Sequence, residues 1–549
     1  MYNDNNRQII YAVSSPCGTG KSYALLKRLT RLKPFYNSLI VLPSIDLIRE
    51  QQSILKEKFD SESTAIHSED GGTGTVLERI LNYLNNAPHN GEILFLTWES
   101  YRHLPYIHNR SHWKIFIDEI PQIDFYGEIR LVDHPAILTD ILTVEINDCP
   151  EGLGKVIAKK VADSGLDFDT VIERGVKRND THKLYADLLK NVDSEFVDVF
   201  VPLKWWQELE RGKRKQAYFV PWLAMMNPSL FEGVTILGAN IEKSIMYRWF
   251  SDFYNVQFKV NKPISQLLLD VPDYSGRIEA VYLTDYRRWS KTAMETKDDD
   301  GVTLRETIDS VLYDYLKDDD FLLCVNRERN NADSWKLESL EGCQRIETVS
   351  RGLNKYHHYN KVVYLPALNR NKHHISMMNT LGIDSDTIYE ATGLENLYQT
   401  LLRTSLRVAE STEKVSLIVP TKRDIEWLEG VLNCEIEHSW IGESEGDNAI
   451  VAANNGSNVV RISSFSEGGN YTNIVNHICK HGYIEKKRSV LLALGFTENE
   501  WKRKINKLEL ELVQSGIQIV TIRRNKNRNG DKTYTYYVSD MNKFNQLAA

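Results

Sequence analysis

The chain has 549 residues, of which 42% are hydrophobic and 26% charged, and its formal net charge is −8. This length exceeds what one hydrophobic core can organise and predicts about three or four domains. No stretch approaches the roughly 18 uninterrupted apolar residues of a membrane span, and the polar N-terminus lacks a signal-peptide pattern, so we expect a cytoplasmic protein with no membrane partner. Six scattered cysteines without a CxxC pair indicate neither a disulfide framework nor a zinc site.

The first predicted element is a strand over 9–13, which runs into the loop SSPCGTGKS and then into a helix. Backbone amides at a helix N-terminus can curl around phosphates, and glycines permit that close approach. The ammonium of Lys21 would reach the β- and γ-phosphates, and the Ser22 hydroxyl would hold Mg²⁺. The loop therefore predicts an ATP site formed by Ser15, Pro16, Cys17, Gly18, Thr19, Gly20, Lys21 and Ser22.

Further apolar strands alternate with helical segments, and a helix over 44–51 opens with Ser44 as its N-cap. This alternation is typical of a parallel sheet whose ligand site lies at the carboxyl ends of the strands. Asp118 and Glu119 stand at such an end, where Asp118 can hold Mg²⁺ and Glu119 can orient or deprotonate a water. The predicted strands of this sheet are 9–13, 38–43, 92–97, 113–117 and 233–240.

The stretch from 124 to 230 has a less regular pattern with helical segments, and we interpret it as an insertion in a first domain over 1–270. A second α/β domain over 271–432 follows, with a helix over 303–316. A linker rich in Gly, Asn and Ser is expected over 433–466. The predicted strands of the second domain are 278–283, 321–325, 361–365 and 415–420.

The last segment, 467–549, has a different pattern from the rest of the chain. Three predicted helices precede two alternating strands joined by a basic turn, and this order resembles a winged helix-turn-helix. Between 480 and 532, Lys and Arg exceed Asp and Glu by seven, so we expect a DNA-binding face, with a charged structural cap as the alternative. The expected contacts are Lys502, Arg503, Arg523, Arg524, Lys526 and Arg528.

With these motifs in order, the chain resembles the superfamily 2 helicases of the DExH/D type. SSPCGTGKS matches their motif I, Asp118-Glu119-Ile120-Pro121 motif II, and the run from Gln399 to Arg407 motif VI. Weaker matches are 41–51 to motif Ia, 97–100 to Ic, 237–240 to III, 324–326 to IV and 350–354 to V. The runs SRGLNKY and VVYLPALNR are similar to viral and phage helicases of the herpesvirus origin-binding type.

The resemblance implies two tandem RecA-like domains with ATP between them and single-stranded DNA lying across both. Arg403 and Arg407 would then face the γ-phosphate from the second domain, with Gln399 one turn earlier; their spacing of four predicts one helix face. Gly352 would contribute to the nucleotide site. Contacts to the DNA backbone would come from Pro43, Thr97, Ser350 and Asn354.

Two functions remain open at this point. The first is an ATP-dependent DNA helicase or translocase of replication, recombination or repair, with replication proteins as further partners. The second is a replication initiator or regulator in which ATP only switches the conformation. A small-molecule kinase would share the phosphate loop but would leave the second α/β domain and the basic tail without a role.

Overall fold

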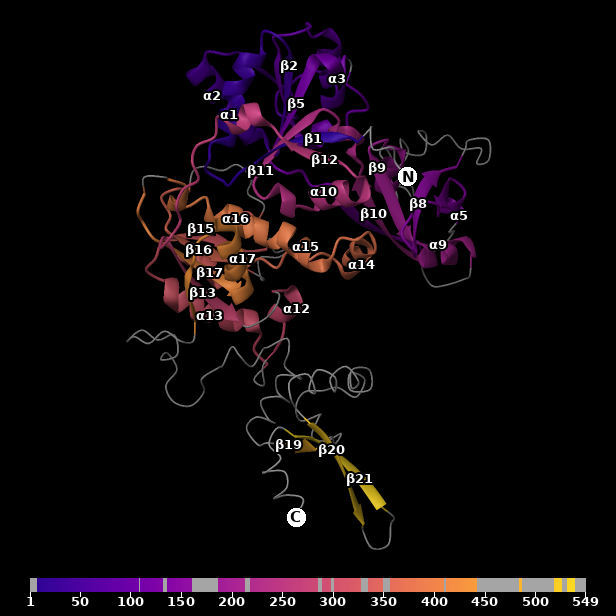
Figure 1. Cartoon of the computed structure of the whole chain (residues 1–549), viewed down its shortest axis with the longest axis vertical. Coiled ribbons are helices and arrows are strands. Elements are labelled where there is room, and N and C mark those ends of the chain that lie inside the picture. The colour runs from indigo at the N-terminus through magenta and orange to yellow at the C-terminus, as the bar shows by residue number, and fades with distance from the viewer. Residues whose placement is uncertain are drawn as a thin grey trace.

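The computed structural model describes residues 7–441 with gaps at 108, 132–135, 160–185, 213–217, 285–288, 298–300, 327–333, 349–355 and 409–410, and further on the strand segments 483–485, 518–525 and 531–538. Two parallel α/β sheets follow one another along the chain, and an antiparallel sheet is inserted within the first (Figure 1). The predicted α/β class is confirmed, and the tandem parallel sheets have the arrangement expected of RecA-like domains.

The first sheet has seven parallel strands in the order β12-β1-β11-β5-β2-β4-β3, and with its helices we call it the first lobe. All five strands predicted for it are confirmed, and Ser44 caps α2 by accepting the amide of Leu47. Its strands are β1 (Ile9–Ser14), β2 (Asn37–Leu42), β3 (Thr64–Ala65), β4 (Ile93–Thr97), β5 (Trp113–Asp118), β11 (Val234–Gly238) and β12 (Gln257–Val260). Its helices include α1 (Lys21–Leu32), α2 (Ile45–Phe59), α3 (Val76–Asn86), α4 (Trp98–Arg102), α10 (Ile245–Arg248) and α11 (Lys262–Ser265).

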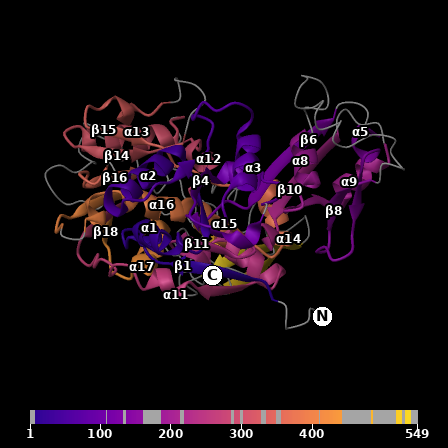
Figure 2. The ribbon, with the colours of Figure 1, turned by 90° about the horizontal axis from the view of Figure 1, so that it is seen from above.

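The insertion sheet lies to one side of the first lobe, as the view from above shows (Figure 2). It has five antiparallel strands in the order β6-β10-β9-β8-β7, a sheet that the sequence did not predict, and the helical segments expected there are present beside it. The strands are β6 (Asp124–Leu131), β7 (Leu142–Glu145), β8 (Leu153–Ala158), β9 (Val197–Pro202) and β10 (Tyr218–Met226). The helices are α5 (Ala136–Thr139), α8 (Ala186–Asp193) and α9 (Leu203–Glu210).

The second lobe is built on six parallel strands in the order β15-β14-β16-β17-β13-β18, and its helix α13 begins with a capping box between Thr303 and Glu306. The strand β18 (Glu437–Trp440) pairs with β13, so this part of the expected linker belongs to the sheet. The other strands are β13 (Ile278–Thr284), β14 (Phe321–Cys324), β15 (Cys343–Ile346), β16 (Lys361–Tyr364) and β17 (Val415–Thr421). The helices are α12 (Lys291–Met294), α13 (Leu304–Leu316), α14 (Lys372–Thr380), α15 (Ser385–Tyr389), α16 (Glu395–Leu401) and α17 (Lys422–Leu432).

Near the C-terminus, β20 (Gln518–Asn525) and β21 (Asp531–Val538) form the predicted antiparallel pair, and β19 (Tyr483–Glu485), which we did not predict, adds a third strand beside β21. The three helices predicted over 471–481, 486–494 and 498–515 lie outside the described residues. The winged helix therefore stays a prediction. Among the described helices, none has the length and apolar character needed to cross a bilayer.

Candidate active site

The phosphate loop is a fixed cradle between β1 and α1. Gly18 and Gly20 have φ angles of +87° and +73°, in the left-handed region that side-chain-bearing residues rarely adopt. The amide of Ser15 donates to the carbonyl oxygen of Gly238 at 3.0 Å, and the Thr19 hydroxyl donates to the carbonyl oxygen of Pro16 at 2.9 Å. These hydrogen bonds and the two left-handed glycines fix the path of the loop backbone between β1 and α1.

The Lys21 ammonium closes this loop on itself. Its Nζ donates to the carbonyl oxygens of Ser15 at 2.6 Å and Pro16 at 2.8 Å. A phosphate oxygen carries a full negative charge and forms the stronger, charge-assisted hydrogen bond. We therefore expect a triphosphate in the loop to displace these two carbonyl oxygens and to bind the Lys21 ammonium itself.

Ser22 and Asp118 bring two side-chain oxygens together next to the phosphate loop. The Ser22 hydroxyl donates to Oδ2 of Asp118 at 2.6 Å, and Asp118 is the last residue of β5, with 6% of its surface exposed. Burial raises the pKa of the Asp118 carboxyl, while the hydrogen bond from Ser22 and the charge of Lys21 oppose that rise. Mg²⁺ takes one or two protein oxygens together with substrate phosphates, so this donor set fits it.

Glu119 follows Asp118 with a backbone φ of +83°, a left-handed conformation that is costly for a residue with a Cβ. The amide of Glu119 donates to the carbonyl oxygen of Leu237 at 2.8 Å, which holds this turn against β11. The Glu119 residue lines the same cavity as Lys21 and Asp118. The turn thus places a second acidic residue next to Asp118 at the cavity.

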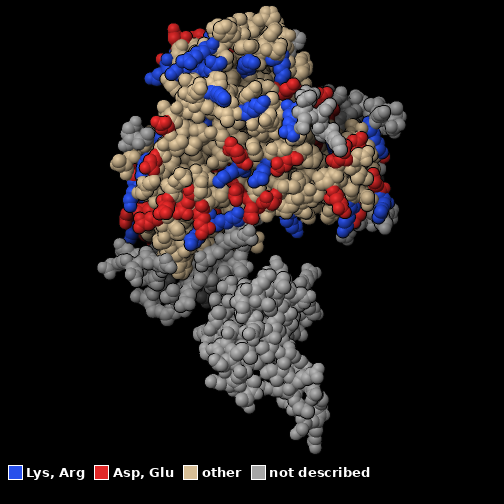
Figure 3. Space-filling view, in the orientation of Figure 1, with Lys and Arg blue, Asp and Glu red and all other residues tan. Residues whose placement is uncertain are grey.

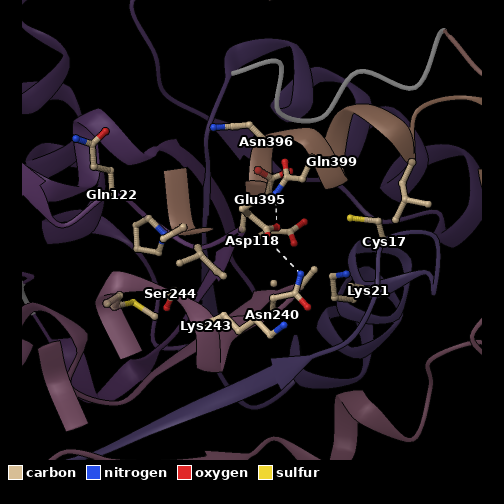
Figure 4. A pocket seen from close by; sticks show the side chains of 18 of the residues that line it. Cys17, Lys21, Asp118, Gln122, Asn240, Lys243, Ser244, Glu395, Asn396 and Gln399 are labelled. Atoms are coloured by element: carbon tan, nitrogen blue, oxygen red, sulfur yellow. Dashed lines mark hydrogen bonds between the residues drawn. The ribbon is translucent and has the colours of Figure 1, made fainter. Parts of the chain in front are cut away.

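The cavity has a volume of about 500 Å³ and receives residues from both lobes (Figure 4). From the second lobe, Gln399, Arg403 and Arg407 line it. The Arg407 Cγ lies 3.9 Å from where a Cβ on Gly18 would stand, so this side chain packs directly over the phosphate loop. Arg403 is 6% exposed; burial lowers the pKa of its guanidinium, and the carboxylate of Glu119 opposes this change.

The expectation that both arginines share one helix face is wrong. α16 ends at Leu401, and Arg407 lies in the separate 3₁₀ turn η10 (Ser405–Arg407). Tertiary hydrogen bonds explain this break, because the Ser405 amide donates to the carbonyl oxygen of Tyr359 at 3.2 Å and Arg277 donates to that of Ser405 at 3.1 Å. The chain therefore turns after α16, and both side chains still reach the cavity.

Three residues outside the predicted set of site residues connect the lobes at this cavity, and one of them, Asn240, lies in the segment matched to motif III. Asn240, which follows β11, donates its side-chain amide to Oε2 of Glu395 at 2.9 Å, and Gln399 donates to Oε1 of the same carboxylate at 3.2 Å (Figure 4). The amide of Cys17 donates to the hydroxyl of Tyr398 at 3.0 Å. Glu395 and Tyr398 precede the expected motif VI residues on α16, but their sequence alone gave no signal of these contacts.

Other predicted residues lie away from the cavity. Pro43 follows β2, and Thr97 ends β4, where its hydroxyl accepts the amide of Ser100 at 3.2 Å. Both lie at the same sheet edge as Asp118, because β5, β2 and β4 are adjacent parallel strands. Arg523 and Arg524 lie on the strand β20 near the C-terminus. Outside the described residues are Ser350, Gly352, Asn354, Lys502, Arg503, Lys526 and Arg528.

Neither a protein-family model nor a curated protein matches the chain. The solved structures that are similar to it include helicases. The chain is 11% identical to an XPD helicase (TM-score 0.36, covering 78% of this chain and 96% of that one). It is 10% identical to S. cerevisiae Dbp5 bound to RNA and ADP-BeF3 (0.32, 80% and 86%) and 13% identical to the DEAD-box helicase Mss116 (0.32, 92% and 83%). At these scores the similarity assigns neither an activity nor a ligand.

Proposed function

We propose that this chain is an ATP-driven motor on nucleic acid, a helicase or translocase that hydrolyses ATP between its two lobes. One observation carries the proposal. The phosphate loop with Asp118 and Glu119 faces Arg403 and Arg407 across a single cavity, although at least 284 positions (403 − 119) separate the two groups along the chain. Such a site is complete only while the lobes are together, which is the requirement for coupling hydrolysis to lobe motion.

The chemistry follows from the place of each group. The loop amides and Lys21 would hold the β- and γ-phosphates, and Ser22 with Asp118 would hold Mg²⁺, which offsets the phosphate charge. Glu119 would orient the attacking water or accept its proton. Guanidinium groups are permanently charged, so Arg403 and Arg407 would stabilise the negative charge on the transferred phosphoryl group.

Hydrolysis would weaken the contact between the lobes, because the arginines lose their phosphoryl partner when the γ-phosphate leaves. The Asn240–Glu395 and Cys17–Tyr398 hydrogen bonds are direct contacts between the lobes beside that phosphate position. Alternate loosening and tightening of one lobe against the other would move a bound strand.

We propose that the nucleic acid along which the protein moves is DNA, and that the protein acts in replication, recombination or repair. Pro43 and Thr97 would contact its backbone at the carboxyl edge of the first sheet, and the basic C-terminal segment would add affinity through phosphates. On the face shown in Figure 3, acidic side chains gather over the second lobe, which disfavours that face as the path of a polyanion. Ser350 and Asn354 would contribute contacts from the second lobe.

The test uses the full chain in ATPase and strand-displacement assays with forked, tailed and blunt substrates of DNA and RNA. We expect ATP turnover that single-stranded DNA stimulates, together with release of the labelled strand. Lys21→Ala should lower turnover at least about 100-fold through the lost phosphate contact. Lys27→Ala, on the same helix α1, is the matched control and should leave turnover unchanged.

The competing function predicts a different result. A replication initiator or regulator switched by ATP would bind DNA in a nucleotide-dependent way without displacing a strand. That result, or ATP turnover indifferent to every nucleic acid, would overturn the motor.

A further inference from the structure

α14 and α15 leave the second lobe and pack against the insertion sheet and the first lobe, as the orange helices beside β10 show (Figure 1). We propose that the insertion sheet positions the cavity arginines by anchoring these helices through Asp124, Arg370 and His374. This inference rests on the proposed ATP hydrolysis. It gives the insertion a role that the phosphate-loop chemistry does not require.

The anchor is a buried ionic cluster centred on Asp124, the first residue of β6. The Asp124 residue is 1% exposed; Arg370 reaches its two carboxylate oxygens at 3.0 and 3.3 Å, and Nε2 of His374 lies 3.1 Å from Oδ2. Burial alone would raise the pKa of Asp124, but His374 and Arg370 hold it below its usual value. A buried carboxylate needs these partners, so breaking the cluster leaves a charge uncompensated.

Side chains around the cluster extend the same contact. The His374 ring stacks on Tyr126 of β6, with centroids 5.0 Å apart and planes 6° from parallel. Glu128 accepts hydrogen bonds from the Tyr126 hydroxyl at 2.7 Å and from Asn371 at 3.1 Å. The contact therefore covers alternate residues on one face of β6, Asp124, Tyr126 and Glu128, rather than a single pair.

Apolar packing adds to these polar contacts. Met377 and Met378 of α14 and Ile388 of α15 are buried in the same hydrophobic cluster as Ile117 of β5 and Ile236 of β11. This segment of the second lobe thus shares the core of the first lobe. An interface of this kind persists when the lobes move, because separating it would expose buried apolar side chains.

The anchored segment leads directly to the arginines. α15, the π-helical turn η9 (Glu390–Leu394) and α16 form one uninterrupted helical run. Ile388 belongs to the first-lobe core, whereas the next residue, Tyr389, belongs to the second-lobe core and donates its hydroxyl to Asp424 at 3.0 Å. One end of the run is therefore fixed to both lobes, and the other end carries Gln399 and precedes Arg403.

This arrangement separates nucleotide binding from phosphoryl transfer. Lys21, Ser22 and Asp118 are held by contacts within the first lobe, so loosening the Asp124 cluster should leave most of the nucleotide affinity intact. Asp124 and Arg370 also line the cavity, and the Cys17 amide donates to Tyr398 of α16, so the nucleotide Kd is the measurement that distinguishes positioning from direct binding. The arginines would be misplaced, and a misplacement of about 1 Å can cost roughly 100-fold in rate. Asp124, Arg370 and His374 are then positioning residues, and their loss should lower kcat without changing the nucleotide Kd.

The experiment compares Asp124→Asn and His374→Phe in the full chain, measuring kcat, the Kd of a fluorescent ATP analogue and amide hydrogen exchange. We expect kcat to fall roughly 10- to 100-fold in Asp124→Asn, with the Kd within about twofold and faster exchange in α16 but not in α1. His374→Phe keeps an aromatic ring over Tyr126 and leaves the ion pair between Arg370 and Asp124 intact, so kcat should fall less than in Asp124→Asn. Lys204→Gln, an exposed change on α9 beside the insertion sheet, is the matched control and should show none.

Wild-type kcat and wild-type exchange in α16 of a folded Asp124→Asn would overturn the inference, and so would a parallel loss of nucleotide binding. If Asp124→Asn fails to unfold cooperatively on heating, His374→Phe decides the matter by the same two readouts. If the wild type turns over no ATP, the proposed function fails, while the exchange of α16 in the variants still tests the anchor.

Discussion

The two lobes build their halves of the active site in different ways. In the first lobe, Lys21, Ser22 and Asp118 bond to one another or to the loop itself. In the second lobe, Arg403 and Arg407 follow a helix that contacts the first lobe through Glu395 and Tyr398 and continues from α14 and α15, which dock on the first-lobe core. The first-lobe half is therefore held mainly by its own contacts, whereas the half that would stabilise the transferred phosphoryl group depends on how elements distant in sequence dock. Binding and turnover should accordingly respond to different mutations.

The largest expected effect comes from the arginines. Arg403→Ala or Arg407→Ala should lower kcat by roughly 1,000-fold, because the charge facing the phosphoryl group is lost. The nucleotide Kd should change by no more than a few-fold, since the loop contacts remain. Stopped-flow binding and steady-state turnover measure the two quantities. Lys422→Ala, at an exposed site of the second lobe, is the control. A loss of binding equal to the loss of turnover would remove the distinction between the lobes.

A smaller effect concerns pH in the first lobe. Burial raises the pKa of Asp118, so its carboxylate takes up a proton at a higher pH than an ordinary aspartate, whose pKa is about 3.9. Only the ionised carboxylate can hold Mg²⁺. Bound Mg²⁺ would favour the ionised form, so protons and Mg²⁺ compete for Asp118. Affinity for Mg-ATP should therefore decline on acidification, and the decline should begin at a higher pH when Mg²⁺ is limiting. Asp118→Asn should abolish this pH dependence in a binding titration, and an unchanged profile would contradict the assignment.

The smallest expected effect tests a single contact between the lobes. Tyr398→Phe keeps the buried ring but removes the hydroxyl that accepts the Cys17 amide. The loss of one neutral hydrogen bond costs about 1 kcal/mol, so kcat/KM for ATP should fall by about fivefold. Tyr313→Phe, in the partly exposed face of α13, provides the comparison. An unchanged kcat/KM would show that the phosphate loop does not sense the second lobe through this hydroxyl.

Features set by local sequence could be predicted. The strand, loop and helix around Lys21, the cap at Ser44 and the helix that begins after Thr303 depend on residues within a few positions of one another. The order of Asp118 after the phosphate loop likewise placed both at one sheet edge, because parallel strands bring their carboxyl ends together.

Features set by tertiary contacts could not be predicted. The sequence of β10 is almost entirely apolar and contains Pro221. From such a run alone, a buried strand cannot be told from a buried helix. The end of α16 before Arg403 depends on hydrogen bonds from Ser405 to Tyr359 and from Arg277 to Ser405, which no local pattern reveals. The same holds for the docking of α14, whose partners lie more than 200 residues earlier in the chain.

The left-handed backbone at Glu119 has an evolutionary consequence. Glycine would adopt this φ with less strain, so under the proposed function we expect selection for the carboxylate to keep a glutamate here. A lineage that kept ATP solely as a switch would be free to drift to glycine or asparagine here while retaining the glycines of the loop. The residue at this one position in related chains should therefore distinguish chains that hydrolyse the nucleotide from chains that bind it without hydrolysis.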